Sequence, residues 1–225
     1  MKNYLKLSFA VMALMLSFNV FANAQVNEIL KRMDEHYKAL TSLKANIMMN
    51  KYNAQLDEPD ITEGTVMYLP SRGRDATVRI DWAKPRVEIL AVKDKQYVFY
   101  TPSLKRAFTG KVNEAQKDTK ASGLLDFMSM SNTQIRENYT IKYLGTETFT
   151  GGFDAWHLEL TPKTAKSYKS SEIWVDGNGM PIQTKIIEKN NDSTTVLLTN
   201  LKKNVTINGA DFKVNIPRDT NVIKN

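Results

Sequence analysis

The two histidines are the first candidates for acid–base or metal chemistry in this sequence. His36 lies beside Tyr37 in a segment of helical periodicity, and His157 alternates with Trp156 and Leu158 in a segment of strand character. Catalysis or metal binding by histidine needs partner groups, and the sequence places none beside either residue. Isolated histidines are more often surface or boundary residues, so we predict no catalytic residues and no metal site.

Other usual sources of reactive groups are also missing. The sequence contains no cysteine, which excludes a disulfide framework, a thiol nucleophile and a zinc–thiolate site. It has no G-x-S-x-G, H-E-x-x-H or glycine-rich phosphate-binding pattern. The acidic pairs Asp34–Glu35 and Asp57–Glu58 fit solvated surface positions, because adjacent helical residues point about 100° apart and the second pair precedes Pro59. We therefore predict that the protein is not an enzyme and needs no cofactor.

The N-terminal segment has the pattern of a secretory signal peptide. Lys2 and Lys6 precede an apolar run that ends at Phe21, and Ala22-Asn23-Ala24 forms an A-x-A cleavage pattern. We predict that residues 1–24 are removed by cleavage before Gln25 and that the protein is exported. An uncleaved membrane anchor is the alternative, although the run is close to the lower length limit for a membrane span.

The rest of the chain is predicted to form a single domain, residues 25–225. It shows no internal repeat and no low-complexity linker. The whole sequence has a net charge of +7, and its basic residues are scattered. A nucleic-acid site would need a basic patch with interleaved aromatic residues, so we predict no nucleic-acid partner.

The elements that would position any site are mainly strands. Val26, Ile29, Leu30 and Met33 recur at three- and four-residue steps, which predicts one amphipathic helix over residues 26–43. Short strands with tight turns follow, and they are typical of a curled antiparallel sheet or open barrel. The predicted strands include residues 64–69, 78–82, 104–112, 139–148, 153–160, 171–175, 182–188 and 194–201.

The chain carries more apolar surface than one side of a sheet requires. Residues 89–102 read as a hairpin that is apolar on both faces, since Ile89 and Ala91 point one way and Leu90 and Val92 the other. Residues 121–131 form a short segment of helical spacing that is apolar nearly all round. These residues either fill an ordinary core or surround a cavity for an apolar ligand, and the pattern alone leaves both readings open.

The order of the segments resembles that of the periplasmic lipoprotein-carrier family, the LolA-like proteins. The resemblance covers the predicted mature chain and rests on a series of short stretches. They are YKALTSLKANI, EGTVMYL, VRIDWAKP, ILAVKDKQYVFYTP, GLLDFM, LTP, DGNGMP and ADFKVNIP.

The resemblance implies a fold and a role. The fold is mainly β with short helices (α+β), an incomplete antiparallel β-barrel covered by the N-terminal helix and a short lid helix. Its apolar cavity would hold the acyl chains of lipoproteins in the periplasm. The carrier, expected to be a monomer without catalytic activity, would take them from an inner-membrane ATP-driven release complex to an outer-membrane acceptor. A lipid-binding or lipoprotein-sensing module of the same fold is the alternative; a hydrolase is a third reading, which no group of residues supports.

The resemblance also implies which residues form the site. The lid would be formed by Leu124, Leu125, Phe127 and Met128, and it would cover Val78, Ile80, Trp82, Ile89 and Phe99. The family has an arginine that latches the lid, and counting back from Pro85 places Arg74 at that position. Arg72 is the other candidate for the latch, and a solvated loop arginine is the alternative for both.

Overall fold

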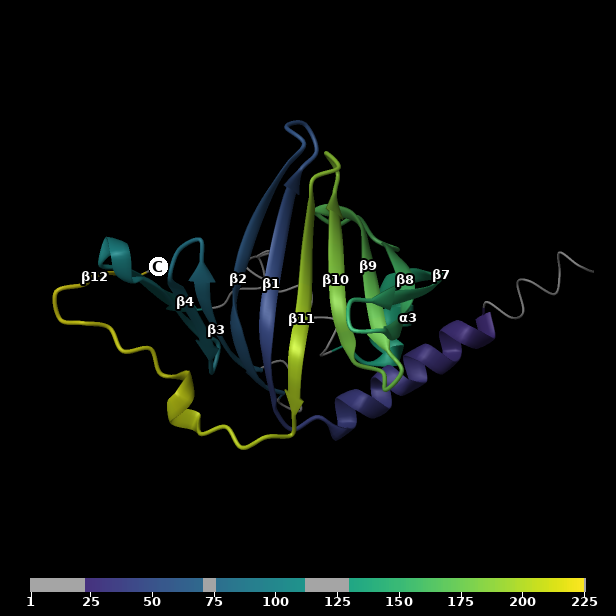
Figure 1. Ribbon diagram of the computed structural model, residues 1–225, viewed down its shortest axis with the longest axis horizontal. Helices are drawn as coiled ribbons and strands as arrows, with labels where there is room; N and C mark the ends of the chain where they lie inside the picture. The colour runs from purple at the N-terminus through teal and green to yellow at the C-terminus, as the bar shows by residue number, and fades with distance from the viewer. Residues whose placement is uncertain (1–22, 71–75, 112–129, 225) are drawn as a thin grey trace, which may run out of the picture.

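The architecture is one open, curved sheet of twelve strands in the computed structural model, which describes residues 23–70, 76–111 and 130–224 (Figure 1). In chain order the strands are β1 (Leu43–Asn53), β2 (Glu58–Leu69), β3 (Thr77–Lys84), β4 (Glu88–Lys93), β5 (Gln96–Thr101), β6 (Arg106–Lys111), β7 (Tyr139–Phe149), β8 (Phe153–Pro162), β9 (Tyr168–Asp176), β10 (Pro181–Glu188), β11 (Ser193–Lys203) and β12 (Asn221–Lys224).

Neighbouring strands are ordered β12-β6-β5-β4-β3-β2-β1-β11-β10-β9-β8-β7 across the sheet. Every pairing is antiparallel except that of β12 with β6, which is parallel. The two end strands, β12 and β7, do not pair with each other, so the sheet does not close. The predicted fold, a mainly β incomplete barrel with short helices, is confirmed.

Helical segments accompany the sheet. The N-terminal helix covers residues 23–39, and the short elements are η1 (Pro102–Leu104), α3 (Asn132–Asn138) and η3 (Gly209–Phe212). The N-terminal helix ends earlier than predicted, because Leu43 already belongs to β1. Most of the predicted lid segment, residues 121–131, lies outside the described residues. No helix in the described part of the chain combines the length and apolar character that crossing a bilayer requires.

The N-terminal helix packs against one half of the sheet. Val26, Ile29, Leu30 and Met33 are buried in a cluster with Ile135 of α3 and with side chains of β7, β8 and β9. The β9–β10 turn lies against the same helix at Gly179, which has a φ of +85°. A Cβ atom there would lie 2.2 Å from the carbonyl oxygen of Arg32, so the close approach of turn and helix requires a glycine.

The strand pairings define two faces of the sheet, because residues directly opposite each other on neighbouring strands share a face. We call the face on which the N-terminal helix packs the inner face. A second buried cluster, which includes Leu43, Val66 and Ile80, continues the inner face onto β1, β2 and β3. The opposite side is the outer face.

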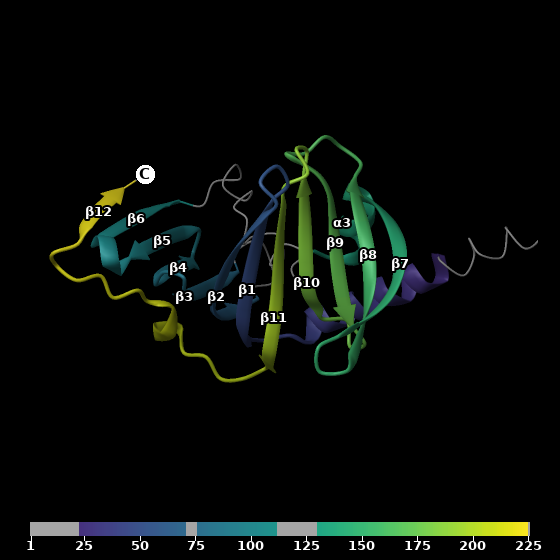
Figure 2. The same ribbon diagram turned by 45° about the horizontal axis from the view of Figure 1, so that its top comes forward.

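A connection from β11 to β12 crosses the outer face of β3 and β4. Residues 204–220 form this connection, which we call the C-terminal strap (Figures 1 and 2). Its η3 turn contacts β3 and β4, and Phe212 in that turn is 3% exposed. Arg79 of β3 donates hydrogen bonds to the carbonyl oxygens of Asp211 and Lys213, at 2.8 and 3.0 Å, and to the carboxylate of Asp81. The strap therefore covers the second apolar face of the β4–β5 hairpin.

Candidate functional site

A continuous row of apolar side chains crosses seven strands on the inner face. Its members pair in sequence across β1, β2, β3, β4, β5, β6 and β12: they are Ala45, Val66, Ile80, Leu90, Phe99, Phe108 and Ile223. We call this set the apolar row. Its first three residues are buried in the core, with Ile80 1% exposed, and the last four are half-buried. The apolar lining thus continues past the core toward the open β12 edge of the sheet.

A parallel line of side chains widens this surface. Val78 pairs with Val92, which pairs with Tyr97 on β5. Val78 is buried, and Val92 and Tyr97 are half-buried. The inner face of β3, β4 and β5 therefore presents aliphatic and aromatic groups over two neighbouring lines, which suits an extended apolar ligand.

Five of the predicted lipid-binding residues lie in the described part of the chain, and the pairings bring four of them to one face. Val78, Ile80 and Trp82 are buried on the inner face of β3, and Phe99 joins them through Leu90. Ile89 lies on the outer face, since it pairs with Asp81 and Tyr100. Grouping Ile89 with the inner residues was wrong, because both faces of the hairpin are apolar and only the register tells them apart.

The remaining predicted site residues lie outside the described residues. They are the lid residues Leu124, Leu125, Phe127 and Met128 and the two candidate latch residues Arg74 and Arg72. Their roles stay predictions.

Sequence reasoning missed five half-buried residues of the inner face, and two of them are Val92 and Ile223. The other three lie beside Phe99: Leu90 and Phe108 pair with it, and Tyr97 lies two residues before it in β5. The alternation of β4 and β5 separates their residues into two sets. Which set lies on the inner face could be assigned only from the pairing of Leu90 with Ile80 on β3.

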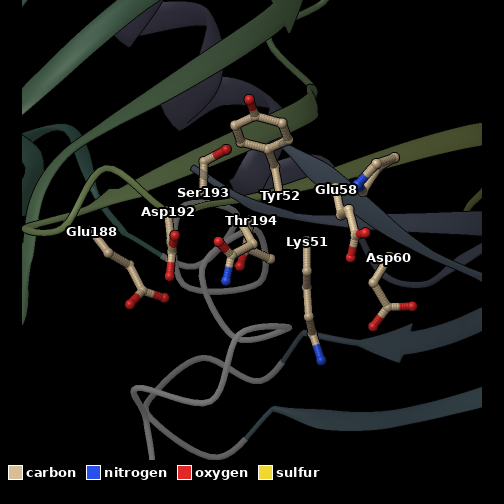
Figure 3. Close-up of a pocket in the computed structure, with 10 residues that line it drawn as sticks. Lys51, Tyr52, Glu58, Asp60, Glu188, Asp192, Ser193 and Thr194 are labelled. Carbon is tan, nitrogen blue, oxygen red and sulfur yellow. The ribbon is translucent and has the colours of Figure 1, made fainter. Parts of the chain in front are cut away.

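The inner face becomes polar toward the tip of the β1–β2 hairpin. Lys51 pairs with Asp60 and with Thr194, two residues beyond the apolar Met49. A pocket of about 250 Å³ lies there, lined by Lys51, Tyr52, Asn53, Glu58, Pro59, Asp60, Glu188, Asp192, Ser193 and Thr194. Figure 3 shows Glu188 and Asp192 on one side of it, Glu58 and Asp60 on the other and Lys51 between them. Such a lining is unsuited to acyl chains, and it marks the polar end of the inner face.

The two histidines lie in separate places and differ in their contacts. The ring of His157 stacks on Trp174 with centroids 4.1 Å apart, its Nδ1 lies 2.6 Å from Glu147 and its Nε2 lies 2.9 Å from Glu172. Both ring nitrogens are therefore engaged within the sheet. His36 lies on the N-terminal helix, where burial, and secondarily the charge of Lys203, lowers its pKa below the ordinary value. No group of three histidine, aspartate or glutamate residues that could hold a metal occurs in residues 23–70, 76–111 and 130–224.

An open antiparallel sheet with an apolar inner face that extends beyond its core can provide a binding surface for apolar ligands. The sequence matches the family model of the outer membrane lipoprotein carrier protein LolA over residues 40–215, so the chain belongs to the LolA family. This confirms the resemblance. No curated protein sequence matches the chain.

Solved structures with the same fold are distant in sequence. An uncharacterized conserved protein from Thermus thermophilus is 14% identical with a TM-score of 0.57, over 89% of this chain and 99% of that one. A chain of the Pseudomonas aeruginosa MucA/MucB complex is 13% identical with a TM-score of 0.53, over 88% of this chain and 63% of that one. The Mycobacterium tuberculosis lipoprotein LppX is 14% identical with a TM-score of 0.50, over 83% of this chain and 99% of that one. At these identities the likeness concerns the fold alone.

Proposed function

We propose that the protein is a periplasmic carrier that holds the acyl chains of lipoproteins against its inner face and moves them from the inner to the outer membrane. The observation that carries this proposal is the apolar row, which runs from buried Ile80 to half-buried Phe99, Phe108 and Ile223 at the open side of the sheet. Membership of the LolA family supports the choice of ligand.

The energetics of acyl chains support a sheath of this kind. Each methylene removed from water contributes about 0.8 kcal/mol, so a lipoprotein with several free chains does not leave a membrane unaided. Half-buried aromatic side chains give the ligand apolar contact without enclosing it in a rigid slot. A lid formed by Leu124, Leu125, Phe127 and Met128, held by Arg74 or Arg72, would supply the remaining cover and would permit release.

The proposed role includes specific partners and no chemistry. The carrier would receive acylated lipoproteins from an ATP-driven release complex in the inner membrane and would deliver them to an acceptor at the outer membrane. It would act as an exported monomer, after removal of residues 1–24. We propose no catalytic activity for it.

Binding of an apolar fluorescent probe tests the inner face directly. Phe99→Glu places a carboxylate in the apolar row, and we expect it to weaken probe affinity about tenfold, because an unpaired charge is costly in apolar surroundings. Val98→Glu is the matched control, since Val98 is the preceding residue of the same strand and is also half-buried, but pairs with Ala91 on the outer face. Equal losses in the two variants, after both are shown to be folded, would contradict the assignment of the inner face.

Release of lipoproteins tests the carrier role itself. Inner-membrane vesicles that contain the release complex and ATP are incubated with the protein, and we expect a soluble one-to-one complex with a lipoprotein. Phe127→Glu should reduce the yield if the predicted lid takes part. Retention of the lipoprotein by the vesicles, together with normal probe binding, would refute the shuttle and leave the alternative of a lipid-binding or lipoprotein-sensing module.

A further inference from the structure

Three exposed apolar side chains gather at one corner of the sheet, where β4 begins and β5 ends. Val87 immediately precedes β4, Leu104 ends η1 between β5 and β6, and Val222 lies on β12; they are 52%, 56% and 44% exposed. We call these three residues the corner patch. Single exposed apolar residues are ordinary, whereas several at one end of a sheet are a candidate interaction surface.

The strand register places the three residues along one end of the sheet, with β5 and β6 between Val87 and Val222. Ile89, Tyr100, Ala107 and Val222 form one line of paired residues on the outer face across β4, β5, β6 and β12. Val87 lies two residues before Ile89 and therefore opposite the start of η1, which carries Leu104. Figure 2 shows β4, β5, β6 and β12 together at one end of the sheet.

Basic residues surround the corner patch. They are Lys84, Arg86, Lys105, Arg218 and Lys224, and all five are exposed. Three acidic residues balance part of this charge: Glu63 pairs with Lys84 at 3.0 Å, Asp219 pairs with Lys105 at 2.6 Å, and Glu88 lies 3.7 Å from Arg86. Arg218 and Lys224 form no ion pair with another described residue, so the corner keeps an excess of positive charge.

The edge strand β12 connects this corner with the candidate binding site. Ile223 ends the apolar row on the inner face, and its neighbour Val222 belongs to the corner patch on the outer face. An acyl chain that leaves the apolar row at this edge would emerge beside the patch. A surface at that position is well placed to rest on a bilayer during transfer.

We propose that the corner patch and its basic rim dock the protein onto the surface of an anionic phospholipid bilayer. The corner patch consists of exposed aliphatic side chains, which can insert among lipid headgroups. They are Val87, Leu104 and Val222. The surrounding cations complement the negative surface of such a membrane. The inference rests on the proposed function, because it names the place at which a carrier would meet its donor or acceptor membrane.

Flotation with lipid vesicles tests the docking surface. The exported protein is mixed with vesicles of equal parts phosphatidylglycerol and phosphatidylcholine, or of phosphatidylcholine alone, at low and high salt. We expect binding to the anionic vesicles that weakens with salt, because exposed charges are screened. The variant Arg218→Glu/Lys224→Glu should lower the partition coefficient about fivefold for each cation removed, and Leu104→Ser should lower it about fivefold.

Matched controls separate docking from general charge or hydrophobicity. Lys169→Glu/Lys189→Glu makes the same charge change at exposed positions, one in β9 and one just after β10, and Leu56→Ser removes a leucine that is 66% exposed at the β1–β2 turn. The proposal is overturned if the control variants lose as much binding as the corner variants, or if the protein does not float with anionic vesicles. Absence of flotation combined with loss of lipoprotein release in the corner charge variant would assign the corner to an acidic protein surface instead.

Failure of this inference is distinguishable from failure of the carrier role. Probe binding at the inner face is measured on the same samples and does not require a bilayer. Normal probe binding without flotation overturns the docking surface alone, whereas normal flotation without probe binding overturns the carrier and leaves a membrane-associated protein with another role.

Discussion

The best-defined long-range contact in the structure is the one that Arg79 makes with the C-terminal strap, and Arg79→Ala tests it. The guanidinium donates to the carbonyl oxygens of Asp211 and Lys213 and pairs with the carboxylate of Asp81. The side chain of Arg79 is 20% exposed, so these bonds are partly shielded from water. We expect the substitution to loosen the strap from the outer face of β3 and β4.

The size of the effect follows from the bonds that are lost. A hydrogen bond with a charged partner contributes about 1.5–3 kcal/mol when buried, and partial exposure favours the lower end of that range. Loss of the two bonds to the strap therefore predicts a decrease of about 2–3 kcal/mol in the free energy of unfolding. The pair with Asp81 adds little, because the carboxylate is 34% exposed and recovers hydration when the arginine is removed.

Urea denaturation measures the decrease, and amide hydrogen exchange locates it. The amide of Asn221 donates to the carbonyl oxygen of Lys105 at 2.8 Å where β12 joins β6, and its exchange should accelerate in Arg79→Ala. Arg86→Ala is the control, since Arg86 is 58% exposed and lies 3.7 Å from Glu88, and its effect should stay within about 0.5 kcal/mol. Similar losses in both variants, or unchanged exchange at Asn221, would refute the reasoning.

Two further predictions concern the N-terminal helix. Burial lowers the pKa of His36, so the folded state binds fewer protons than the unfolded state near that pKa. The stability that neutral His36 contributes is therefore fully present above the unfolded-state pKa of about 6.5 and is lost as the pH falls below it. Urea midpoints measured from neutral to mildly acidic pH should fall less steeply in His36→Gln than in the original protein, and equal slopes would contradict this. Gly179→Ala should lower the free energy of unfolding by more than about 2 kcal/mol, because its Cβ would clash with the backbone of Arg32 at a positive φ. Gly177→Ala, where a Cβ meets nothing within 4 Å, should be nearly neutral in the same urea titration.

Strands with one apolar face were predictable from the sequence, and most of their bounds agree closely, although β2 begins at Glu58 and the prediction began at residue 64. Val78, Ile80 and Trp82 alternate with Arg79 and Asp81, and β3 runs from Thr77 to Lys84 as that alternation indicates. The two-residue period is sufficient where one face is polar, since burial then fixes the orientation of every side chain. The N-terminal helix was predictable for the same reason, with a period of about 3.6 residues.

The faces of the β4–β5 hairpin were harder to predict, because neither set of alternating residues is polar. Leu90 and Ile89 are equally apolar, and only pairing with Ile80 and Asp81 of β3 assigns one to each face. Pairing between strands is a property of the assembled sheet, which the local pattern does not contain. This is why Ile89 was grouped with the wrong set and Leu90 was missed.

The strap and β12 were missed for a related reason. Their residues show little periodicity. β12 has only four residues, and it pairs with β6 after the long connection that follows β11. The two apolar faces of the hairpin nevertheless contained the signal, because a second apolar face needs a cover and the tail carries Phe212. Arg79 and Asp81 looked like solvated residues of a one-sided strand, whereas they bind that cover.

These features make the two faces of the hairpin interdependent. A four-residue parallel strand forms few ladder bonds, so much of what holds β12 in place must come from the strap and from the contacts of Arg79 and Phe212 on the outer face. Ile223 on β12 is the last residue of the apolar row. Contacts on the outer face therefore set how far the apolar lining of the inner face extends. An apolar ligand bound at the β12 edge would depend on the C-terminal strap, although the strap lies on the opposite face of the sheet.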